Sequence, residues 1–296
     1  MILCVGEILV DMIGAEKDNT FYYERKAGGA PFNVACAVAK FGGSSAFVGC
    51  VGDDTVGNFL EKFVEKQGLT CSYVKKDQTV NTTLAFVELD KTGERSFCFY
   101  RKNTADYRLP EIPEEIFEKA TIVHIGSLML SEEQGERYAL SLAEKAKKAG
   151  KLVSFDVNFR DDIFRDTLSA VTIYKKMIEV ADIVKFSEDE MEIFTKSYVE
   201  SLTDKLVCIS LGANGSRWQY GGKAENVGTI SVKPIDTTGA GDAFYAGVLS
   251  QIDNKEWSNL LFNSAFRFGN VCGALNTLGR GAIDFLPHLQ KIKELL

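Results

Sequence analysis

Short apolar runs alternate along most of this chain with segments in which apolar residues recur every three or four positions. The runs have the length of buried β-strands and cover residues 2–5, 46–50, 121–125, 152–157, 183–186 and 206–210. The segments between them have helical spacing, as in the stretch that follows Ser131, where Ser131 and Gln134 are expected to form a capping box. This alternation predicts an α/β fold of three layers, a sandwich with a mainly parallel central sheet covered by helices on both faces.

Residues 80–105 have a different pattern. Residues 82–89 and 95–101 are typical of two strands joined by a hairpin turn at 90–93, and the second strand is rich in aromatic residues. Because an isolated hairpin is only marginally stable, we expect it to join strands near residues 7–27 in a small sheet. This small β-sheet would be a discontinuous lid, contributed by about 7–27 and 80–105, on a single domain that spans residues 1–296.

Composition and charge narrow the range of functions. A chain of 296 residues is long enough for one large α/β domain, and its net charge of −7 argues against a nucleic-acid partner. No apolar run reaches membrane-spanning length. The seven cysteines form no C-x-x-C pair, which favours buried thiols in the cytoplasm over a zinc site. With only two histidines, catalysis by histidine is not expected.

One glycine-rich segment suggests a specific chemistry. Residues 236–244 read Asp-Thr-Thr-Gly-Ala-Gly-Asp-Ala-Phe and lie between an expected extended segment at 229–235 and an apolar run at 243–249 that is typical of a buried helix. Small residues at such a junction let backbone N–H groups converge where the helix dipole is positive, which favours an anion. Asp242 would repel phosphate there, but it suits a base that takes a proton from a hydroxyl attacking phosphate.

The same segment has two other interpretations. Asp242 could instead cap the helix after an ordinary glycine-rich turn, and the segment alone leaves that alternative open. A dinucleotide-binding loop is disfavoured, because Phe244 stands where G-x-G-x-x-G requires glycine. Elsewhere, polar segments at 156–160, 187–190 and 212–215 follow expected parallel strands, and active residues belong at such strand ends.

Two motifs together resemble a known family. Residues 28–35, Gly-Gly-Ala-Pro-Phe-Asn-Val-Ala, resemble the N-terminal signature of the ribokinase-like (PfkB-type) carbohydrate kinases, and residues 236–249 resemble their C-terminal signature. The motifs occur in the family's order, and the resemblance covers essentially the whole chain. Within the family, Phe99-Tyr100-Arg101, Asp156-x-Asn158-x-Arg160 and Ser187-Glu188-x-Glu190 are most similar to fructokinases.

The resemblance implies an ATP-dependent sugar kinase, in the first place a fructokinase that makes fructose 6-phosphate by in-line transfer. The alternatives are a kinase for another sugar or sugar acid, such as ribose or 2-keto-3-deoxygluconate, and a sugar or nucleotide sensor without activity. An intact Asp242 counts against the sensor, because binding alone needs no base.

The resemblance also assigns roles to matching residues. Asp242 would be the general base, and the amides of Gly239, Ala240 and Gly241 would hold the developing negative charge. The sugar would be bound by Asp11, Gly28, Gly29, Asn33, Arg101, Asn158 and Arg160. The nucleotide would be bound by Ser187, Gly212, Gly215, Asn276 and Gly281. Three alternatives stay open: Arg101 as an exposed ion-pair residue, Arg160 paired with Asp161 or Asp162, and Ser187 as a helix cap.

Metal ions and partners follow from the same resemblance. Glu190 matches the glutamate of the family's N-x-x-E motif and would order Mg²⁺, bound with ATP, through water. Ser187 replaces the asparagine of that motif, so direct ligation there is not expected. The backbone carbonyls of Asp236 and Thr238 resemble a monovalent-cation site, which allows for K⁺. Phe32 is bulky where fructokinases are commonly small, so it would reshape the sugar pocket or pack against the lid. The expected partners are a sugar, ATP and a second copy of the chain docked through the lid.

Overall fold

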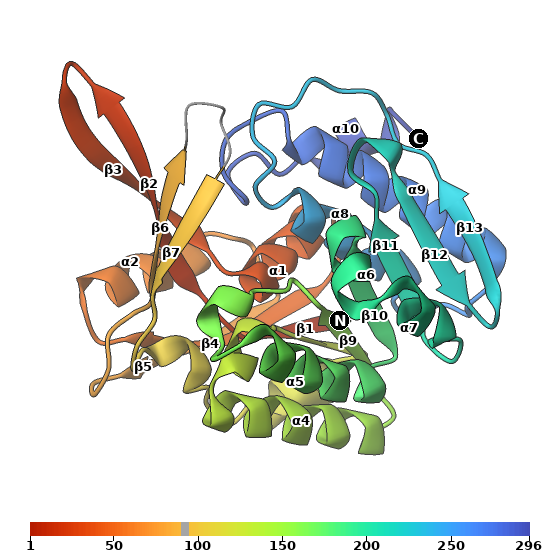
Figure 1. Ribbon diagram of the computed structural model, residues 1–296, viewed down its shortest axis with the longest axis horizontal. Coiled ribbons are helices and arrows are strands. Elements are labelled where there is room, and N and C mark those ends of the chain that lie inside the picture. The colour runs from red at the N-terminus through yellow and green to blue at the C-terminus, as the bar shows by residue number, and fades with distance from the viewer. Residues whose placement is uncertain (90–94) are drawn as a thin grey trace.

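The central element is a sheet of nine strands. The computed structural model describes residues 1–89 and 95–296, so the hairpin turn predicted at 90–93 lies outside the described residues. The sheet runs in the order β13-β12-β11-β10-β9-β8-β1-β4-β5 (Figure 1). Neighbouring strands are parallel from β5 to β11, and within the described chain only the β11–β12 and β12–β13 pairs are antiparallel. The strands are β1 (Ile2–Val5), β4 (Ser45–Gly52), β5 (Cys71–Asp77), β8 (Ile122–Ile125), β9 (Leu152–Asp156), β10 (Ile183–Ser187), β11 (Leu206–Ser210), β12 (Ser216–Tyr220) and β13 (Lys223–Val227).

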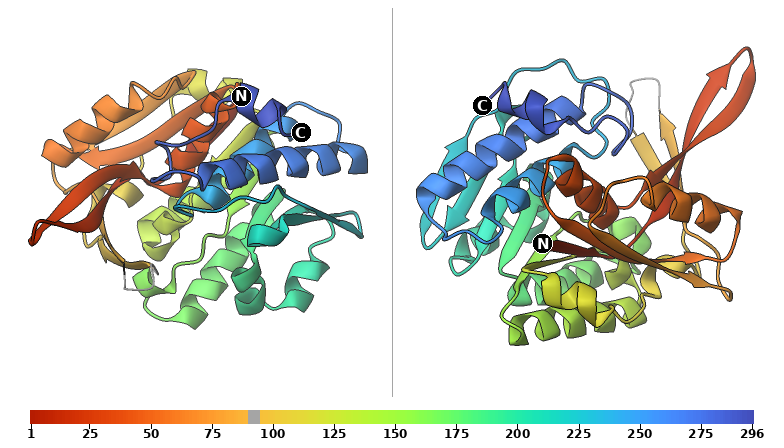
Figure 2. Two further views of the ribbon diagram at one scale, coloured as in Figure 1. Left: turned by 90° about the horizontal axis from the view of Figure 1, so that it is seen from above. Right: turned by 180° about the vertical axis from the view of Figure 1, so that it is seen from behind.

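Helices cover both faces of this sheet (Figure 2). One apolar core contains side chains of α1 (Ala30–Lys40), α2 (Thr55–Val64), α8 (Ala240–Ile252), α9 (Asn259–Asn276) and α10 (Leu289–Lys293). A second core contains side chains of α3 (Glu114–Lys119), α4 (Glu133–Lys148), α5 (Thr167–Val180), α6 (Glu188–Phe194) and α7 (Lys196–Ser201). Four short 3₁₀ turns complete the described elements: η1 (Ala105–Tyr107), η2 (Leu128–Ser131), η3 (Asp161–Ile163) and η4 (Gly212–Asn214). The predicted three-layer α/β fold is confirmed.

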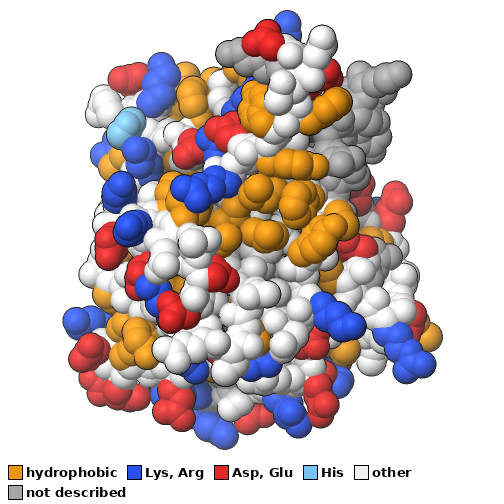
Figure 3. Space-filling model, turned by 90° about the vertical axis from the view of Figure 1, so that its left-hand side faces the viewer, with side chains coloured by type: hydrophobic (Ala, Val, Ile, Leu, Met, Phe, Trp, Pro, Cys, Tyr) orange, Lys and Arg blue, Asp and Glu red, His pale blue; other side chains and the backbone are white. Residues whose placement is uncertain are grey.

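A separate four-stranded sheet projects from the large one (Figure 1). It has the order β3-β2-β6-β7 and contains β2 (Leu9–Lys17), β3 (Thr20–Gly28), β6 (Leu84–Leu89) and β7 (Arg95–Tyr100). Asp11 lies opposite Ala85, which lies opposite Phe99, so these three side chains share one face. The other face carries Tyr23, Phe86 and Tyr100. That side of the molecule shows a group of hydrophobic side chains (Figure 3).

Two local predictions are wrong. Ser131 does not cap α4, because it lies in η2 and its hydroxyl donates to Leu128 O and accepts from Arg101. Residues 229–235 form no strand, and most of this segment lines a cavity instead. In both places, a contact with a distant part of the chain replaces the local pattern that the sequence favours.

Candidate active site

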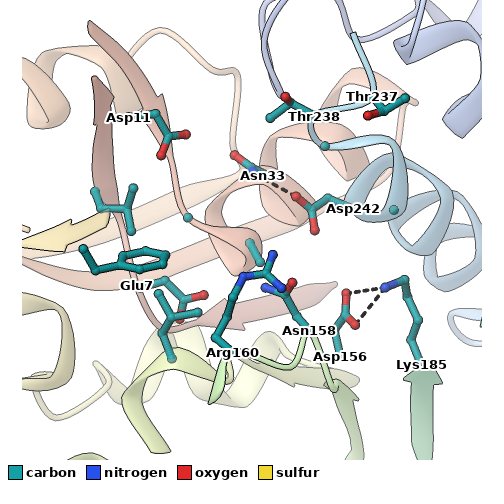
Figure 4. Close-up of a pocket in the computed structure, with 17 residues that line it drawn as sticks. Glu7, Asp11, Asn33, Asp156, Asn158, Arg160, Lys185, Thr237, Thr238 and Asp242 are labelled. Atoms are coloured by element: carbon teal, nitrogen blue, oxygen red, sulfur yellow. Dashed lines mark hydrogen bonds and ion pairs between the residues drawn. The ribbon is translucent and has the colours of Figure 1, made fainter. Parts of the chain in front are cut away.

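A cavity of about 310 Å³ opens where α1, α8 and the carboxyl ends of the parallel strands meet the small sheet (Figure 4). It is lined by many of the residues that sequence reasoning assigned to sugar and phosphate: Asp11, Gly29, Asn33, Asn158, Arg160, Gly239, Gly241 and Asp242. Residues from the first and last fifths of the chain therefore face the same space. The remaining lining comes mainly from Glu7, Leu9, Phe99, Leu128, Asp156 and Lys185.

Asp242 lies in the first turn of α8. The N-cap of this helix is Gly239, with φ 71°, and a Cβ on Gly239 would lie only 2.6 Å from Ala282 Cα. The turn therefore needs glycine, both for its left-handed conformation and for the close approach of Ala282. Asp242 Oδ2 accepts a hydrogen bond of 2.8 Å from Asn33 Nδ2 (Figure 4). The alternative that Asp242 caps the helix is wrong.

The surroundings of Asp242 raise its pKa to about 6. Burial is the largest cause, and the negative charge of Asp156 adds to it, whereas the Asn33 bond and the charges of Lys185 and Arg160 lower the pKa. A carboxyl group with this pKa is ionised near neutrality yet basic enough to accept a proton, which is what a general base requires.

The sugar side of the cavity is formed by β2 and by the turn before α1. The Asp11 carboxylate lies directly against the Cα of Gly28, where any side chain would displace it. Gly29 has φ 113°, and a Cβ there would collide with the carbonyl of Glu7. These two glycines let the start of α1 press against β2, which brings Asn33 beside Asp242.

Three charged residues of this cavity were given no role from the sequence: Glu7, Asp156 and Lys185. Lys185 Nζ donates to both carboxylate oxygens of Asp156, at 2.8 and 2.9 Å, and both side chains are buried (Figure 4). Lys185 interrupts the apolar run Ile-Val-Lys-Phe of β10, and a lysine inside a buried parallel strand was the available signal. The pair lies beneath the first turn of α8, because a Cβ on Gly241 would be 3.5 Å from Lys185 Nζ.

Arg101 does not lie on the surface. Its side chain is buried, with Nε on Asp106, Nη1 on Ser131 and Nη2 2.8 Å from Leu128 O. The alternative of an exposed ion pair is wrong, since the pair with Asp106 is internal. Arg101 does not line the cavity either, so its contact with sugar stays a prediction.

Asn158 and Arg160 follow β9 and face the cavity. Asn158 has φ 36°, an uncommon left-handed conformation for a residue with a side chain, and Arg160 Nη1 donates to Phe159 O at 2.8 Å. The loop is fixed from below, because Glu190 Oε1 accepts from Phe159 N at 2.6 Å. Of the proposed Arg160 partners, the side chain of Asp161 lies outside the described part.

Ser187 and Glu190 form a capping box at the start of α6. Ser187 Oγ accepts from Glu190 N at 3.3 Å, and Glu190 Oε2 accepts from Ser187 N at 2.7 Å, which confirms the capping role of Ser187. Neither residue lines this cavity or the second cavity, which is described next.

A second cavity of about 400 Å³ adjoins the first. Thr237 and Gly241 line both cavities, so the two spaces meet at the turn that begins α8. Gly212 and Gly215 line the second cavity, together with an apolar wall that includes Ile230, Val232, Pro234, Ala240 and Phe244, and their contact with nucleotide stays a prediction. A flat apolar base and a phosphate chain would fit this combination of wall and turn.

Asn276 and Gly281 lie behind this turn and line neither cavity. The Asn276 amide donates to the carbonyls of Thr238 and Ala282, at 3.2 and 3.4 Å. Asp236 accepts from Thr238 N through Oδ1 and from Gly281 N through Oδ2, at 2.8 and 2.9 Å. These bonds hold the turn rigidly, and a direct nucleotide contact for Asn276 or Gly281 stays a prediction.

Phe32 turns away from the cavity. Its ring is fully buried and packs edge-on against Phe47 and Phe63, with ring centroids 5.0 and 6.2 Å apart. The bulky side chain therefore fills the core between β4 and α2, and the expectation that it reshapes the sugar pocket is wrong.

A protein-family model described as pfkB family carbohydrate kinase matches residues 1–289 of the chain. The chain belongs to this family. It is therefore a phosphotransferase that uses an alcohol group as acceptor. Among its relatives, probable fructokinase-7 of Arabidopsis thaliana is 35% identical over 320 residues, an alignment that covers 100% of this chain and 92% of the relative.

Solved structures of fructokinases have the same fold. The fructokinase of Xylella fastidiosa with bound ATP superposes with a TM-score of 0.93, at 30% identity, over 99% of this chain and 97% of its own. The fructokinase of Vibrio cholerae O395 bound to fructose, ADP and a calcium ion gives 0.90, at 31% identity, over 100% and 98%. A double mutant of the Vibrio enzyme was solved with fructose, ADP and a potassium ion.

No described helix is long and apolar enough to cross a membrane. Likewise, residues 1–89 and 95–296 contain no group of three or more His, Cys, Asp or Glu side chains arranged to hold a metal ion.

Proposed function

We propose that this carbohydrate kinase is a fructokinase, which transfers the γ-phosphoryl group of ATP to a hydroxyl of D-fructose and yields fructose 6-phosphate. The observation that carries the proposal is the meeting of two cavities at the first turn of α8. Asp242 faces the polar cavity, which suits a sugar, and the apolar wall lies on the other side. The choice of fructose rests on the relatives, several of which are named fructokinases.

The chemistry assigned to this chain's own residues has two parts. Asp242, with its pKa near 6, removes the proton from the attacking hydroxyl, and Asn33 holds the carboxylate in place. The amides of Gly239, Ala240 and Gly241 receive the negative charge of the moving phosphoryl group at the positive end of α8. Asp11, Gly28, Gly29, Asn158 and Arg160 orient sugar and phosphate, since phosphoryl transfer depends mainly on positioning and charge neutralisation.

The oxygens proposed to hold metal ions each have a lone pair left after their hydrogen bonds within the protein. Each Glu190 oxygen accepts one backbone N–H, and a carboxylate oxygen has a second lone pair, so Glu190 can accept from water on a Mg²⁺ ion that arrives with ATP. Such an ion would neutralise phosphate charge. The Asp236 and Thr238 carbonyls are the proposed ligands of K⁺, and the Asn276 bond to Thr238 O leaves that oxygen one lone pair.

The small sheet is proposed as a lid. A closed lid would exclude water from the site, because an open site would let water accept the phosphoryl group.

The outer face of the small sheet carries Tyr23, Phe86 and Tyr100, with ring centroids 5.0 Å apart in both neighbouring pairs, and Tyr100 is 63% exposed. We assign this face to a homodimer, in a cytoplasmic enzyme. Light scattering should show a dimer that Tyr100→Asp converts to a monomer; a monomeric wild-type protein excludes the assembly.

A coupled ADP-release assay over a panel of sugars tests the function. D-Fructose should give the highest kcat/KM, well above ribose, 2-keto-3-deoxygluconate and adenosine. If another member of the panel wins, the fructose assignment is wrong and the kinase assignment stands. If none is phosphorylated while sugar or ATP still binds, the chain is a sensor.

A further inference from the structure

Glu7 is an acidic residue of the sugar cavity to which neither the family motifs nor the proposed mechanism gives a task. It lies between β1 and β2 and lines the cavity (Figure 4). Its side chain is fully buried, and neither carboxylate oxygen has a hydrogen-bond partner among the residues that the structure describes. Asn33, which lines the same cavity, has the same feature, because its Oδ1 is buried without a partner in the described chain.

An unpartnered buried acid is costly, so it needs an explanation. The charged groups around Glu7 are Arg101 after β7, Asp106 in η1 and Asp242 in α8. Arg101 forms an ion pair with Asp106, so its positive charge is largely neutralised by that carboxylate. Burial is the largest cause that raises the pKa of Glu7 to about 8. The negative charges of Asp106 and Asp242 also raise this pKa, whereas the backbone N–H of Glu7 itself and the charge of Arg101 lower it. Glu7 is therefore a neutral carboxylic acid at neutral pH, with one O–H to donate and one oxygen to accept.

Close packing fixes this group in place. The carboxyl touches Gly126, where a Cβ would collide with Glu7 Oε2, and the Glu7 carbonyl lies against Gly29. The backbone on either side thus leaves the acid little freedom to turn toward a protein partner. Glu7 lines the cavity, so a polar group bound there lies next to it.

We propose that Glu7 is a specificity residue of the sugar site, which hydrogen-bonds one hydroxyl of the bound sugar as a neutral acid. The inference rests on the proposed function in that the ligand is a polyol substrate. A hydroxyl both donates and accepts, so it can satisfy both atoms of the acid at once. A substrate that lacks this hydroxyl leaves Glu7 unpaired in the closed site, and the enzyme therefore discriminates against it.

The test compares Glu7→Leu and Glu7→Gln with wild type on sugars that each lack one hydroxyl. The probes are 1-deoxy-, 3-deoxy- and 4-deoxy-D-fructose and 2,5-anhydro-D-mannitol, or the matching derivatives of whichever sugar wins the panel. One deletion should reduce wild-type kcat/KM by roughly 5- to 150-fold through the lost contact. In Glu7→Leu the reduction of kcat/KM caused by removing that hydroxyl should be about twofold or less, while the reductions caused by removing the other hydroxyls should persist. Glu7→Gln should keep it, because an amide also donates and accepts.

The pH dependence gives a second readout. Ionisation of Glu7 removes its donor, so wild-type kcat/KM for the sugar should fall above about pH 8, and Glu7→Gln should lack this alkaline fall. Glu136→Gln on α4, whose carboxylate pairs with Lys176 outside both cavities, is the matched control and should behave as wild type.

Each outcome decides the proposal. If a folded Glu7→Leu protein shows the same reductions of kcat/KM on every deoxy sugar as wild type, Glu7 does not contact the sugar. If Glu7→Gln behaves like Glu7→Leu on these sugars, Glu7 does not act as a neutral hydrogen-bond donor. If Glu7→Leu does not fold, an unchanged alkaline fall in Glu7→Gln overturns the proposal. Failure of the proposed function appears separately, because it is read from wild type on the intact sugars.

Discussion

Asp242→Asn separates the loss of turnover that follows removal of the base from its effect on the stability of the fold. The substitution keeps the shape of the side chain, and the amide oxygen of the new residue can still accept from Asn33 Nδ2. It removes the base, however. A positioned general base contributes ~10²–10⁴-fold to turnover, so kcat should fall by that factor. The KM values for ATP and sugar should change far less, because neither ligand needs this carboxylate in order to bind.

The stability of the same variant should increase. Its folded pKa of about 6 lies above the ordinary value of 3.8, so the folded protein holds the proton more tightly than the unfolded chain. Ionisation therefore destabilises the folded state above about pH 6, and this penalty disappears as the pH falls below about 4. A shift of roughly two units corresponds to at most about 3 kcal/mol, and partial exposure of the side chain reduces the effect to about 1–2 kcal/mol.

Steady-state kinetics and urea unfolding at pH 5 and pH 8 measure both effects. Asp242→Asn should be more stable than wild type at pH 8, and the difference should shrink at pH 5. Asp166→Asn is the matched control, because Asp166 caps α5 by accepting from Ser169 N and asparagine caps equally well. It should leave turnover unchanged. A folded Asp242→Asn protein that keeps most of its kcat would show that Asp242 is not the general base. A variant less stable than wild type at pH 8 would refute the argument that burial raises the Asp242 pKa.

Three further predictions concern neighbouring groups. Lys185→Met should move the acid limb of kcat/KM to higher pH and Asp156→Asn should move it lower, because Lys185 lowers the Asp242 pKa and Asp156 raises it; a limb that stays in place in both variants excludes this coupling. Arg101→Ala should lose ~3–5 kcal/mol in urea unfolding, since it leaves the buried Asp106 without its positively charged partner, whereas a surface ion pair would lose 1 kcal/mol or less. Amide exchange in β6 and β7 should slow when saturating fructose closes the lid, and unchanged exchange would argue against a moving lid.

The sequence determined those features that depend on neighbours along the chain. Strand and helix periods are set by residues two to four positions apart, so the alternation was enough to predict the layered α/β fold. The glycine turn before Asp242 and the capping by Ser187 are also local, because each forms within about one helical turn. The two family signatures identified the family and predicted roles for residues at either end of the chain.

Only the tertiary structure decided which side chains meet. Strand order places β9 beside β10, which pairs Asp156 with Lys185, and it brings Asn33 of α1 to Asp242 of α8. Ser131 has the local pattern of a helix cap but is bonded to Arg101 instead. A residue's partner depends on which elements pack together, and burial then sets the cost of an unpaired charge. For that reason the buried acid Glu7, which no local pattern marks, became visible only in the folded chain.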